Sequence, residues 1–212
     1  MTDKDNNAKI LELLFELYPD AGPELNYSNA FELLIAAILS AQCTDKRVNI
    51  VTADLFRRFP DAESFAQLTP EELEPYIKTC GLYRSKARSI VGACKILVSK
   101  YGGEVPHTRE ELTELPGVGR KVANVVLSNA FGIPAIAVDT HVFRVANRLG
   151  LADASTVDKT EKQLMENIPQ DKWSIAHHLI IFHGRRVCSA QKPKCEACAL
   201  SPYCKAYRTK SF

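Results

Sequence analysis

Helix start and stop signals recur along the whole length of this chain, and they constrain its fold more than any other feature. Thr69-Pro70-Glu71-Glu72 combines an N-cap, a proline at the first helical position and a capping box. Asn29 with Glu32, and Thr108 with Glu111, repeat the capping-box spacing. We find no hairpin signal, no fixed-period repeat and no low-complexity linker. The sequence therefore predicts an all-α protein of roughly ten short helices.

Apolar periodicity and helix-ending residues define the expected elements. The predicted helices are 10–17 before Pro19, the buried run 33–39, 44–59 before Pro60, 85–103 ending in a glycine pair, 140–149 after Asp139, 157–167 before Pro169, and 171–184 stopped by Gly184. The stretch AIAV (135–138) could be mistaken for a strand. It runs directly into a good helix N-cap, so we do not assign it to a sheet.

Size and charge distribution narrow the class of protein. With 212 residues, 46% of them hydrophobic, the chain can form one large domain or two small ones. No apolar run is long enough to span a bilayer, and the polar N-terminus MTDKDNNAK is not a secretory signal, so we expect a soluble intracellular protein. The net charge is only +2, but residues 185–212 carry seven basic side chains and one acidic side chain. This basic tail is a plausible surface for a polyanion.

The segment LPGVGRK (115–121) places a lysine just behind a glycine turn. Gly117 and Gly119 permit a positive φ and a close approach of the backbone to a partner. Lys121 lies in the first turn of the next helix, where a cation is unfavourable unless an anion docks or an uncharged amine is needed. Two short helices joined by this turn are compatible with a helix-hairpin-helix that binds a phosphate through backbone N–H groups. The alternative is an αα-hairpin that only packs.

Lys121 itself has two interpretations. A lysine near a phosphate is most often a counterion, whereas a neutral amine would be a nucleophile for Schiff-base chemistry. Asp139, eighteen residues further on, is a possible carboxylate partner and also a good N-cap for its own helix. Position along the chain does not decide between these roles.

Four of the seven cysteines form a compact pattern near the C-terminus, Cys188-x6-Cys195-x2-Cys198-x5-Cys204. In a chain without a signal peptide this pattern favours a metal centre over two disulfides. Structural zinc sites usually contain two CxxC pairs and only one is present, so the spacing slightly favours an iron–sulfur cluster over zinc. The other three cysteines are dispersed and are expected to be ordinary buried residues: Cys43, Cys80 and Cys94.

Taken together, five features resemble the bacterial endonuclease III family. They are LSAQCTDKRVN (39–49), CGLYRSKA (80–87), LPGVGRKVANVV (115–126), AVDTHVFRVANRLG (137–150) and the cysteine pattern. The resemblance extends over essentially the whole chain, in the same order and without a large insertion. It implies a six-helix barrel over 23–133 with the helix-hairpin-helix at about 108–127. A helical iron–sulfur domain would combine 1–22 with 134–212 and carry the cluster loop at 188–204, and DNA would bind in a cleft between the two domains.

The activity implied by the resemblance is base-excision repair. A DNA N-glycosylase would remove an oxidised pyrimidine of the thymine glycol type, and an AP lyase would then cleave 3′ to the abasic site by β-elimination through a lysine Schiff base. Lys121 would be the nucleophile, facing Asp139, which would assist deprotonation and stabilise the developing positive charge. Gln42 and Leu82 would fill and wedge the space that the extruded nucleotide leaves. From the residues alone they would be a polar loop residue and a minor core leucine.

The resemblance also implies the remaining site residues and partners. Gly117, Val118 and Gly119 would hold a nearby phosphate, and His141 would either contact DNA or have a structural role. The cofactor would be one [4Fe-4S] cluster, with zinc as the alternative, and its ligands would be Cys188, Cys195, Cys198 and Cys204. The expected partner is damaged double-stranded DNA, with no membrane, no indicated protein partner, a monomer as the default and a location in the bacterial cytoplasm at the nucleoid.

Two other functions are compatible with part of the pattern. An adenine mismatch-specific monofunctional glycosylase would share the hairpin, the aspartate and the cluster. It would lack a lysine at position 121 and would carry a further C-terminal domain, whereas this chain has Lys121 and continues only eight residues past Cys204. A non-catalytic DNA-binding module with a structural metal would keep the glycines and the cysteines but would not need Lys121 together with Asp139.

Overall fold

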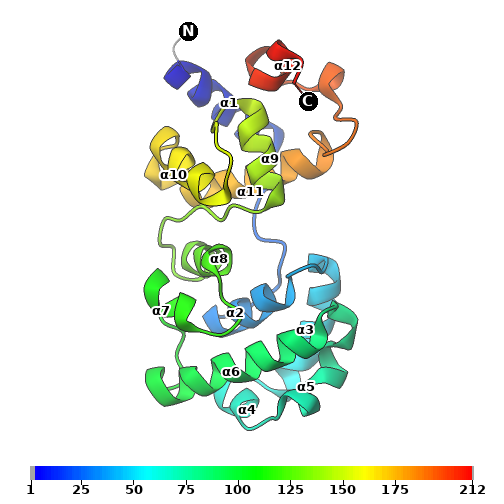
Figure 1. Cartoon of the computed structure of the whole chain (residues 1–212), viewed down its shortest axis with the longest axis vertical. Coiled ribbons are helices and arrows are strands. Elements are labelled where there is room, and N and C mark those ends of the chain that lie inside the picture. Colours follow the sequence, from blue (N-terminus) through cyan, green and yellow to red (C-terminus); the bar gives the residue numbers. More distant parts are fainter. Residues whose placement is uncertain (1–2, 212) are drawn as a thin grey trace. The chain divides into compact units, whose positions relative to one another are not determined.

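Every regular element in residues 3–211, the range that the computed structural model describes, is a helix (Figure 1). The prediction of an all-α fold is therefore confirmed. The chain divides into two compact units: Pro23–Ile133, and the segment up to Gly22 together with the segment from Pro134 onward. Across the described range, no helix combines the length and the apolar character that crossing a membrane requires.

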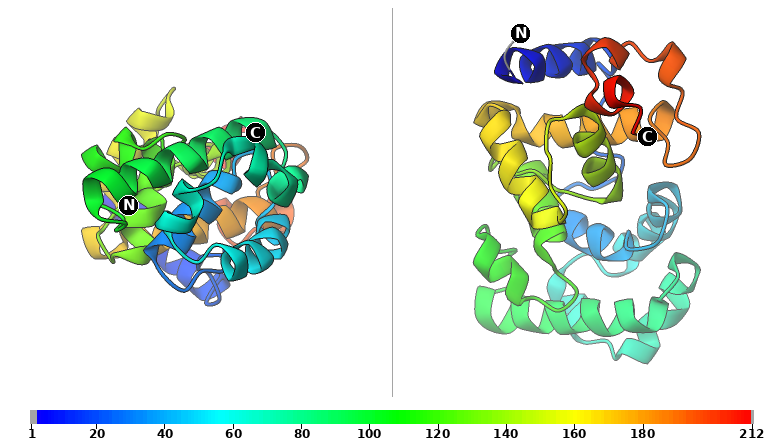
Figure 2. Two further views of the ribbon diagram at one scale, coloured as in Figure 1. Left: turned by 90° about the horizontal axis from the view of Figure 1, so that it is seen from below. Right: turned by 45° about the horizontal axis from the view of Figure 1, so that its top comes forward.

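The unit Pro23–Ile133 is built around a buried helix. Its elements are α2 (Ala30–Leu39), α3 (Asp45–Arg58), α4 (Ala62–Ala66), α5 (Pro70–Ile77), the 3-10 turn η1 (Lys78–Cys80), α6 (Tyr83–Tyr101), α7 (Arg109–Glu114) and α8 (Arg120–Ala130). In α2, every residue from Leu33 to Leu39 is buried, and the helix contacts α3, α6 and α8. Figure 2 shows the long helix α6, against which α4 and α5 pack. The prediction of a buried central helix at 33–39 is confirmed.

The other unit packs its helices around the pair formed by α9 and α11. Its elements are α1 (Asp3–Leu17), α9 (Thr140–Leu149), α10 (Val157–Asn167), η2 (Gln170–Lys172), α11 (Trp173–Arg186), η3 (Cys195–Ala197), η4 (Ser201–Tyr203) and α12 (Lys205–Thr209). The helix α11 contacts both α1 and α9. One continuous core results, with side chains from all three helices, including Ile10, Leu14, Val142, Val145, Leu179 and Ile180.

The predicted N-caps form, but only one predicted capping box is complete. The caps whose side chains accept from the backbone N–H three residues on are Asn29, Thr44, Thr69, Thr108 and Asp139. At Thr69 the bond is reciprocated by Glu72. Elsewhere the N3 glutamate turns to another donor, because Glu32 accepts from Ser28 N (2.6 Å) and Glu111 accepts from the Thr108 hydroxyl (2.6 Å).

The predicted helix stop at Gly184 is wrong, because α11 continues to Arg186. Gly184 lies instead where α11 approaches α9 closely. A Cβ at this position would lie 3.0 Å from Val145 Cγ2 and 3.3 Å from His141 Nδ1. The glycine is therefore needed for helix packing and not for helix termination. Two short helices were also not predicted, α4 with its own capping box at Asp61, and α12.

Two glycines of the LPGVGRK turn have different structural requirements. Gly117 has φ +79°, and a Cβ there would lie only 2.7 Å from Ser89 Cβ. Gly119 has φ −89°, an ordinary value, and none of the described residues has an atom within 4 Å of a Cβ placed on it. Gly117 is thus required by the fold, whereas Gly119 leaves open space beside the start of α8.

These two positions give a matched test of the turn. We expect Gly117→Ala to lower the free energy of unfolding by about 2 kcal/mol, because a positive φ and a steric overlap add together. Gly119→Ala should cost less than about 1 kcal/mol, since alanine is only a poorer N-cap than glycine. Urea unfolding monitored by circular dichroism measures both values. Equal losses for the two variants would contradict this account of the turn.

Candidate functional site

The turn between α7 and α8 presents backbone donors to solvent. Val118 N donates to Leu115 O (3.0 Å), which closes the turn, and α8 then begins after the N-cap Gly119. No side-chain hydrogen bond from the described residues caps this helix start. The first N–H groups of a helix have no intrahelical acceptor and carry partial positive charge. Together with the open space at Gly119, this arrangement suits a phosphate.

Lys121 is the second residue of α8, and its side chain is exposed. It lies two positions after the glycine whose surroundings are open. Its amine is therefore accessible to a ligand that binds at the helix start. Of the predicted phosphate-binding residues, Gly117 and Gly119 are exposed and Val118 is buried. The Val118 N–H is already bonded to Leu115 O, so Val118 shapes the turn between the two glycines.

Asp139 is the N-cap of α9, as its sequence context predicted. Its Oδ1 accepts from Val142 N at 2.8 Å, and the side chain is half-buried. Its Oδ2 has no hydrogen-bond partner within the described residues. The helix start thus fixes the carboxylate while one oxygen remains available for another donor.

Gln42 and Leu82 lie at the tips of two short loops of the Pro23–Ile133 unit. Gln42 lies between α2 and α3 and has φ +51°, and Leu82 lies between η1 and α6 and has φ +45°. Both side chains are exposed, Leu82 to 56%. The loops lie close together, because a Cβ placed on Gly81 would lie 3.8 Å from Gln42 O. An exposed leucine in a left-handed conformation is not a core residue, so that alternative for Leu82 is wrong.

Sequence reasoning missed Lys86, a buried lysine directly beneath these loops. Its side chain is on α6, and Nζ donates to Leu39 O and to Cys80 O, both at 2.7 Å. The residue is 5% exposed, and burial lowers the pKa of the Lys86 amine. A signal was present, because Lys86 falls on the buried stripe of α6 that continues with Ile90 and Leu97.

His141 is tied into its own unit. Its Nδ1 lies 3.3 Å from an Arg144 guanidinium nitrogen, and Arg144 also donates to Gly184 O (3.1 Å) and Cys188 O (3.0 Å). These contacts join α9 to the C-terminal part of α11 and to the start of the cysteine loop. They give His141 a structural environment, and its contact with DNA stays a prediction.

The four C-terminal cysteines are half-buried and influence one another. Burial raises the pKa of the Cys195, Cys198 and Cys204 thiols, and each shift is increased by the neighbouring Cys188 thiol. Within residues 3–211 no three His, Cys, Asp or Glu side chains meet closely enough to hold a single metal ion. The donor set nevertheless consists of four thiols on one short loop, which is the chemistry that iron–sulfur clusters and structural zinc use.

Other groups from the same unit surround this cysteine loop. Arg148 on α9 donates to Ser189 O (2.7 Å) and Ala190 O (3.0 Å), and its guanidinium lies 3.6 Å from Cys188 Sγ. On the other side, His183 Nε2 lies 3.7 Å from Cys198 Sγ. The loop is therefore attached to α9 and α11 by side chains and has positive charge beside its first thiol.

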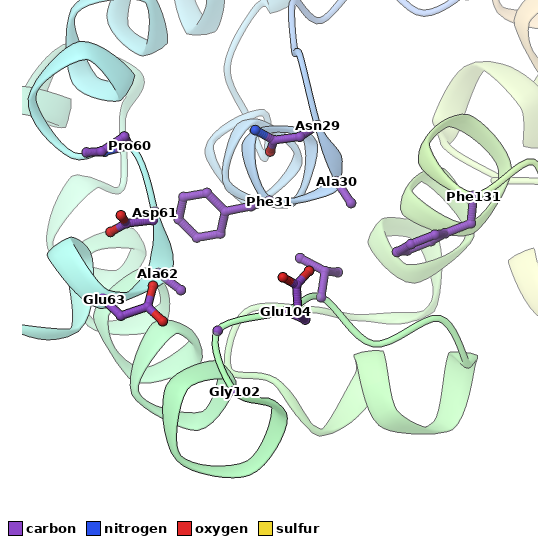
Figure 3. A pocket seen from close by; sticks show the side chains of 12 residues that line it. Asn29, Ala30, Phe31, Pro60, Asp61, Ala62, Glu63, Gly102, Glu104 and Phe131 are labelled. Atoms are coloured by element: carbon purple, nitrogen blue, oxygen red, sulfur yellow. The ribbon is translucent and has the colours of Figure 1, made fainter.

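A cavity of about 340 Å³ in the Pro23–Ile133 unit contains none of the predicted site residues (Figure 3). It lies among the starts of α2 and α4 and the turn after α6. Figure 3 shows the carboxylates of Asp61, Glu63 and Glu104 around it. Clustered carboxylates repel phosphates, so this cavity does not suit a DNA backbone. The glycine turn at the start of α8 has the opposite electrostatic character.

Comparison with known proteins places the chain in a family. The family model described as "HhH-GPD superfamily base excision DNA repair protein" matches residues 35–170. Endonuclease III of Bacillus subtilis is 50% identical over 196 residues, which cover 92% of this chain and 90% of that protein. Endonuclease III of Escherichia coli (strain K12) is 48% identical over 202 residues, with coverage of 94% and 96%.

Solved structures agree with this assignment. A trapped endonuclease III–DNA covalent intermediate superposes with a TM-score of 0.94 at 49% identity, over 100% of both chains. A non-covalent endonuclease III–DNA complex gives 0.93 at 50% identity, over 99% of both. The chain therefore belongs to the HhH-GPD superfamily of base excision DNA repair proteins and, within it, to the endonuclease III family, whose members are DNA glycosylases and AP lyases.

Proposed function

We propose that this chain excises oxidised pyrimidines of the thymine glycol type from duplex DNA and then cleaves the strand 3′ to the abasic site. The observation that carries the proposal is the exposed lysine in the first turn of α8, beside an open, uncapped helix start. A phosphate bound at the turn of Gly117, Val118 and Gly119, by the backbone donors that the turn leaves open, would bring the adjacent sugar close to this lysine. Backbone donors carry no base information, so they would hold any sequence.

Lys121 supplies the nucleophile in this proposal. Its neutral amine attacks C1′ of the damaged nucleotide, and the base leaves with the electron pair of the glycosidic bond. The free oxygen of Asp139 accepts the proton that the lysine ammonium must lose and stabilises positive charge at the sugar. The C1′–O4′ bond then breaks, O4′ takes up a proton as the sugar ring opens, and the resulting Schiff base acidifies the C2′ protons. Loss of one C2′ proton then expels the 3′ phosphate by β-elimination.

Gln42 and Leu82 act on the DNA duplex before the chemistry. The damaged nucleotide has to leave the base stack, which costs about a few kcal/mol and less for a damaged pair. An exposed apolar side chain at a loop tip can insert between bases and occupy the vacated space. Leu82 is such a side chain, and the neighbouring Gln42 provides an amide that can hydrogen-bond to the base left unpaired.

Cys188, Cys195, Cys198 and Cys204 would hold one [4Fe-4S] cluster. When bound, the cluster would cross-link the loop 188–204 and fix the basic residues on it. Arg144 and Arg148 already attach the start of this loop to α9 and so prepare the first ligand. Zinc is the alternative occupant of the same four thiols. The proposal places no step of the reaction on the metal.

The remaining expectations follow from the same reaction. Both proposed catalytic residues belong to one chain, so a monomer is sufficient. A bacterial repair enzyme acts on the nucleoid, which places it in the cytoplasm. His141, next to Thr140 at the start of α9, is proposed as a residue near the DNA backbone.

Of the two alternative functions, the adenine mismatch glycosylase needs no lysine at position 121, and a non-catalytic module needs neither Lys121 nor Asp139.

Borohydride trapping tests the lysine mechanism. Reduction during reaction with an oligonucleotide that contains thymine glycol should give a covalent protein–DNA complex, because the Schiff base is converted to a stable amine. Lys121→Ala should reduce the complex to background without loss of stability, since the side chain is exposed. The exposed Lys95→Ala on α6 is the matched control and should trap as the wild type does. Equal trapping by Lys121→Ala would exclude the mechanism.

Asp139→Asn separates capping from catalysis. Asparagine caps a helix about as well as aspartate, so stability should fall by less than about 1 kcal/mol. Base excision should slow by about 100-fold or more, because the amide cannot accept the proton. Single-turnover kinetics and thermal unfolding on the same preparations measure both quantities. A variant with wild-type excision would show that Asp139 serves only the helix.

Elemental analysis tests the cluster. We expect about four iron and four sulfide ions per chain, with visible absorbance that disappears when the cluster is removed. Substitution of Cys198 by alanine should abolish this absorbance and lower the melting temperature. One zinc ion per chain with no iron would show that the four thiols form a zinc site instead.

Leu82→Gly tests whether the Leu82 side chain inserts between the bases. Unlike most substitutions to glycine, it is not expected to destabilise the protein. Because Leu82 is exposed and has a positive φ, glycine should leave the free energy of unfolding unchanged or raise it by up to about 1 kcal/mol. Excision of thymine glycol from a stable duplex should slow by about tenfold. Cleavage at an abasic site made in advance should slow less. Equal losses in the two assays would argue against insertion into the base stack.

A further inference from the structure

We propose that Lys86 is a positioning residue for extrusion of the damaged nucleotide. It sets the spacing between the loop that carries Gln42 and the loop that carries Leu82. This inference rests on the proposed function, because it assumes that both side chains enter the DNA. Unlike Gln42 and Leu82, Lys86 is buried, so its effect on nucleotide extrusion is transmitted through the backbone of the two loops.

The Lys86 side chain joins the two loops at their origins. Leu39 is the last residue of α2, and Cys80 is the last residue of η1. Nζ donates to the carbonyl oxygens of both, at 2.7 Å each. Gln42 follows Leu39 by three residues and Leu82 follows Cys80 by two. A single side chain therefore fixes the points from which both loop tips project.

The backbone of Lys86 makes a third connection. Its N–H donates to Leu82 O at 3.0 Å, so the same residue holds Leu82 from the first turn of α6. The carbonyl groups at the end of a helix have no intrahelical donor and are left for outside donors to satisfy. Lys86 provides those donors for two helix ends at once, in a place from which water is excluded. Without Nζ these carbonyls would lose a buried partner, and the loops would lose their common anchor.

The loops need an outside anchor because of their own conformation. Gln42 and Leu82 both have a positive φ, which a non-glycine residue keeps only when its surroundings impose it. Two side chains that fill one gap in DNA also need a fixed separation, since ordering loose loops during binding would weaken insertion. The loop tips already lie close together, because a Cβ placed on Gly81 would lie 3.8 Å from the Gln42 carbonyl oxygen.

The test compares two reactions of the same protein. Lys86→Met keeps a long side chain but removes the donors. We expect it to slow single-turnover excision of thymine glycol from a stable duplex by about tenfold, and cleavage at a pre-formed abasic site by less than about twofold. Lys95→Met, exposed on the same helix, is the matched control and should leave both rates unchanged. Fluorescence of 2-aminopurine beside the lesion should show reduced unstacking with Lys86→Met alone.

A double-mutant cycle with Leu82→Gly distinguishes positioning from general destabilisation. If Lys86 acts through the wedge, Lys86→Met should slow excision far less in the Leu82→Gly background than in the wild type. Additive effects, or equal losses in excision and abasic-site cleavage, would overturn the inference. If Lys86→Met does not fold, Lys86→Arg is used, because its wider guanidinium must separate the two carbonyls. It should lower the ratio of excision to abasic-site cleavage, and a wild-type ratio would contradict the proposal.

Failure of this inference can be told apart from failure of the proposed function. If wild-type protein neither excises thymine glycol nor is trapped by borohydride, the proposed function fails. If the wild type does both and Lys86→Met behaves as Lys95→Met does, only the role of Lys86 is refuted.

Discussion

Unsatisfied backbone groups at helix ends are the constraint on which this structure depends. A chain built from many short helices has many such ends, and each must find a partner within the protein, in solvent or in a ligand. Side chains cap most helix starts directly, as Asn29 and Thr69 do. The residues to which we assign functions lie where this requirement is met in another way. The start of α8 is left open, Asp139 uses one oxygen of two, and Lys86 serves two helix ends.

The helices themselves were largely predictable because their signals are local. An N-cap, a proline or a periodic apolar face acts within a few residues, so α10 was predicted with its observed bounds of 157–167. The wrong helix end arose where a distant partner decided the outcome. Gly184 continues its helix because it faces Val145 on α9, a contact that no local pattern reveals. Glu32 completes no capping box because Ser28 N competes for its carboxylate.

The residues of the candidate site also differ in how well the sequence could predict them. The glycine turn, Lys121 and the four cysteines form patterns along the chain, so sequence could identify them. The left-handed conformations of Gln42 and Leu82 and the buried position of Lys86 depend on how α2, η1 and α6 meet. Sequence contained indirect traces of only two of these features: a glycine before Leu82 and a lysine on an apolar stripe. A charged residue at a core position of a helix is thus a useful signal for such an anchor, since burial requires partners for it.

The strained backbone of the exposed residue Leu82 requires a physical explanation. A fold under selection for stability alone would place glycine at Leu82, because an exposed leucine gains little from burial and its positive φ costs about 1 kcal/mol or more. The strain persists because Lys86 holds both loops from below. We propose that the leucine side chain is kept in this conformation for a partner outside the protein. In the proposed function, this partner is a base stack from which one nucleotide has been removed.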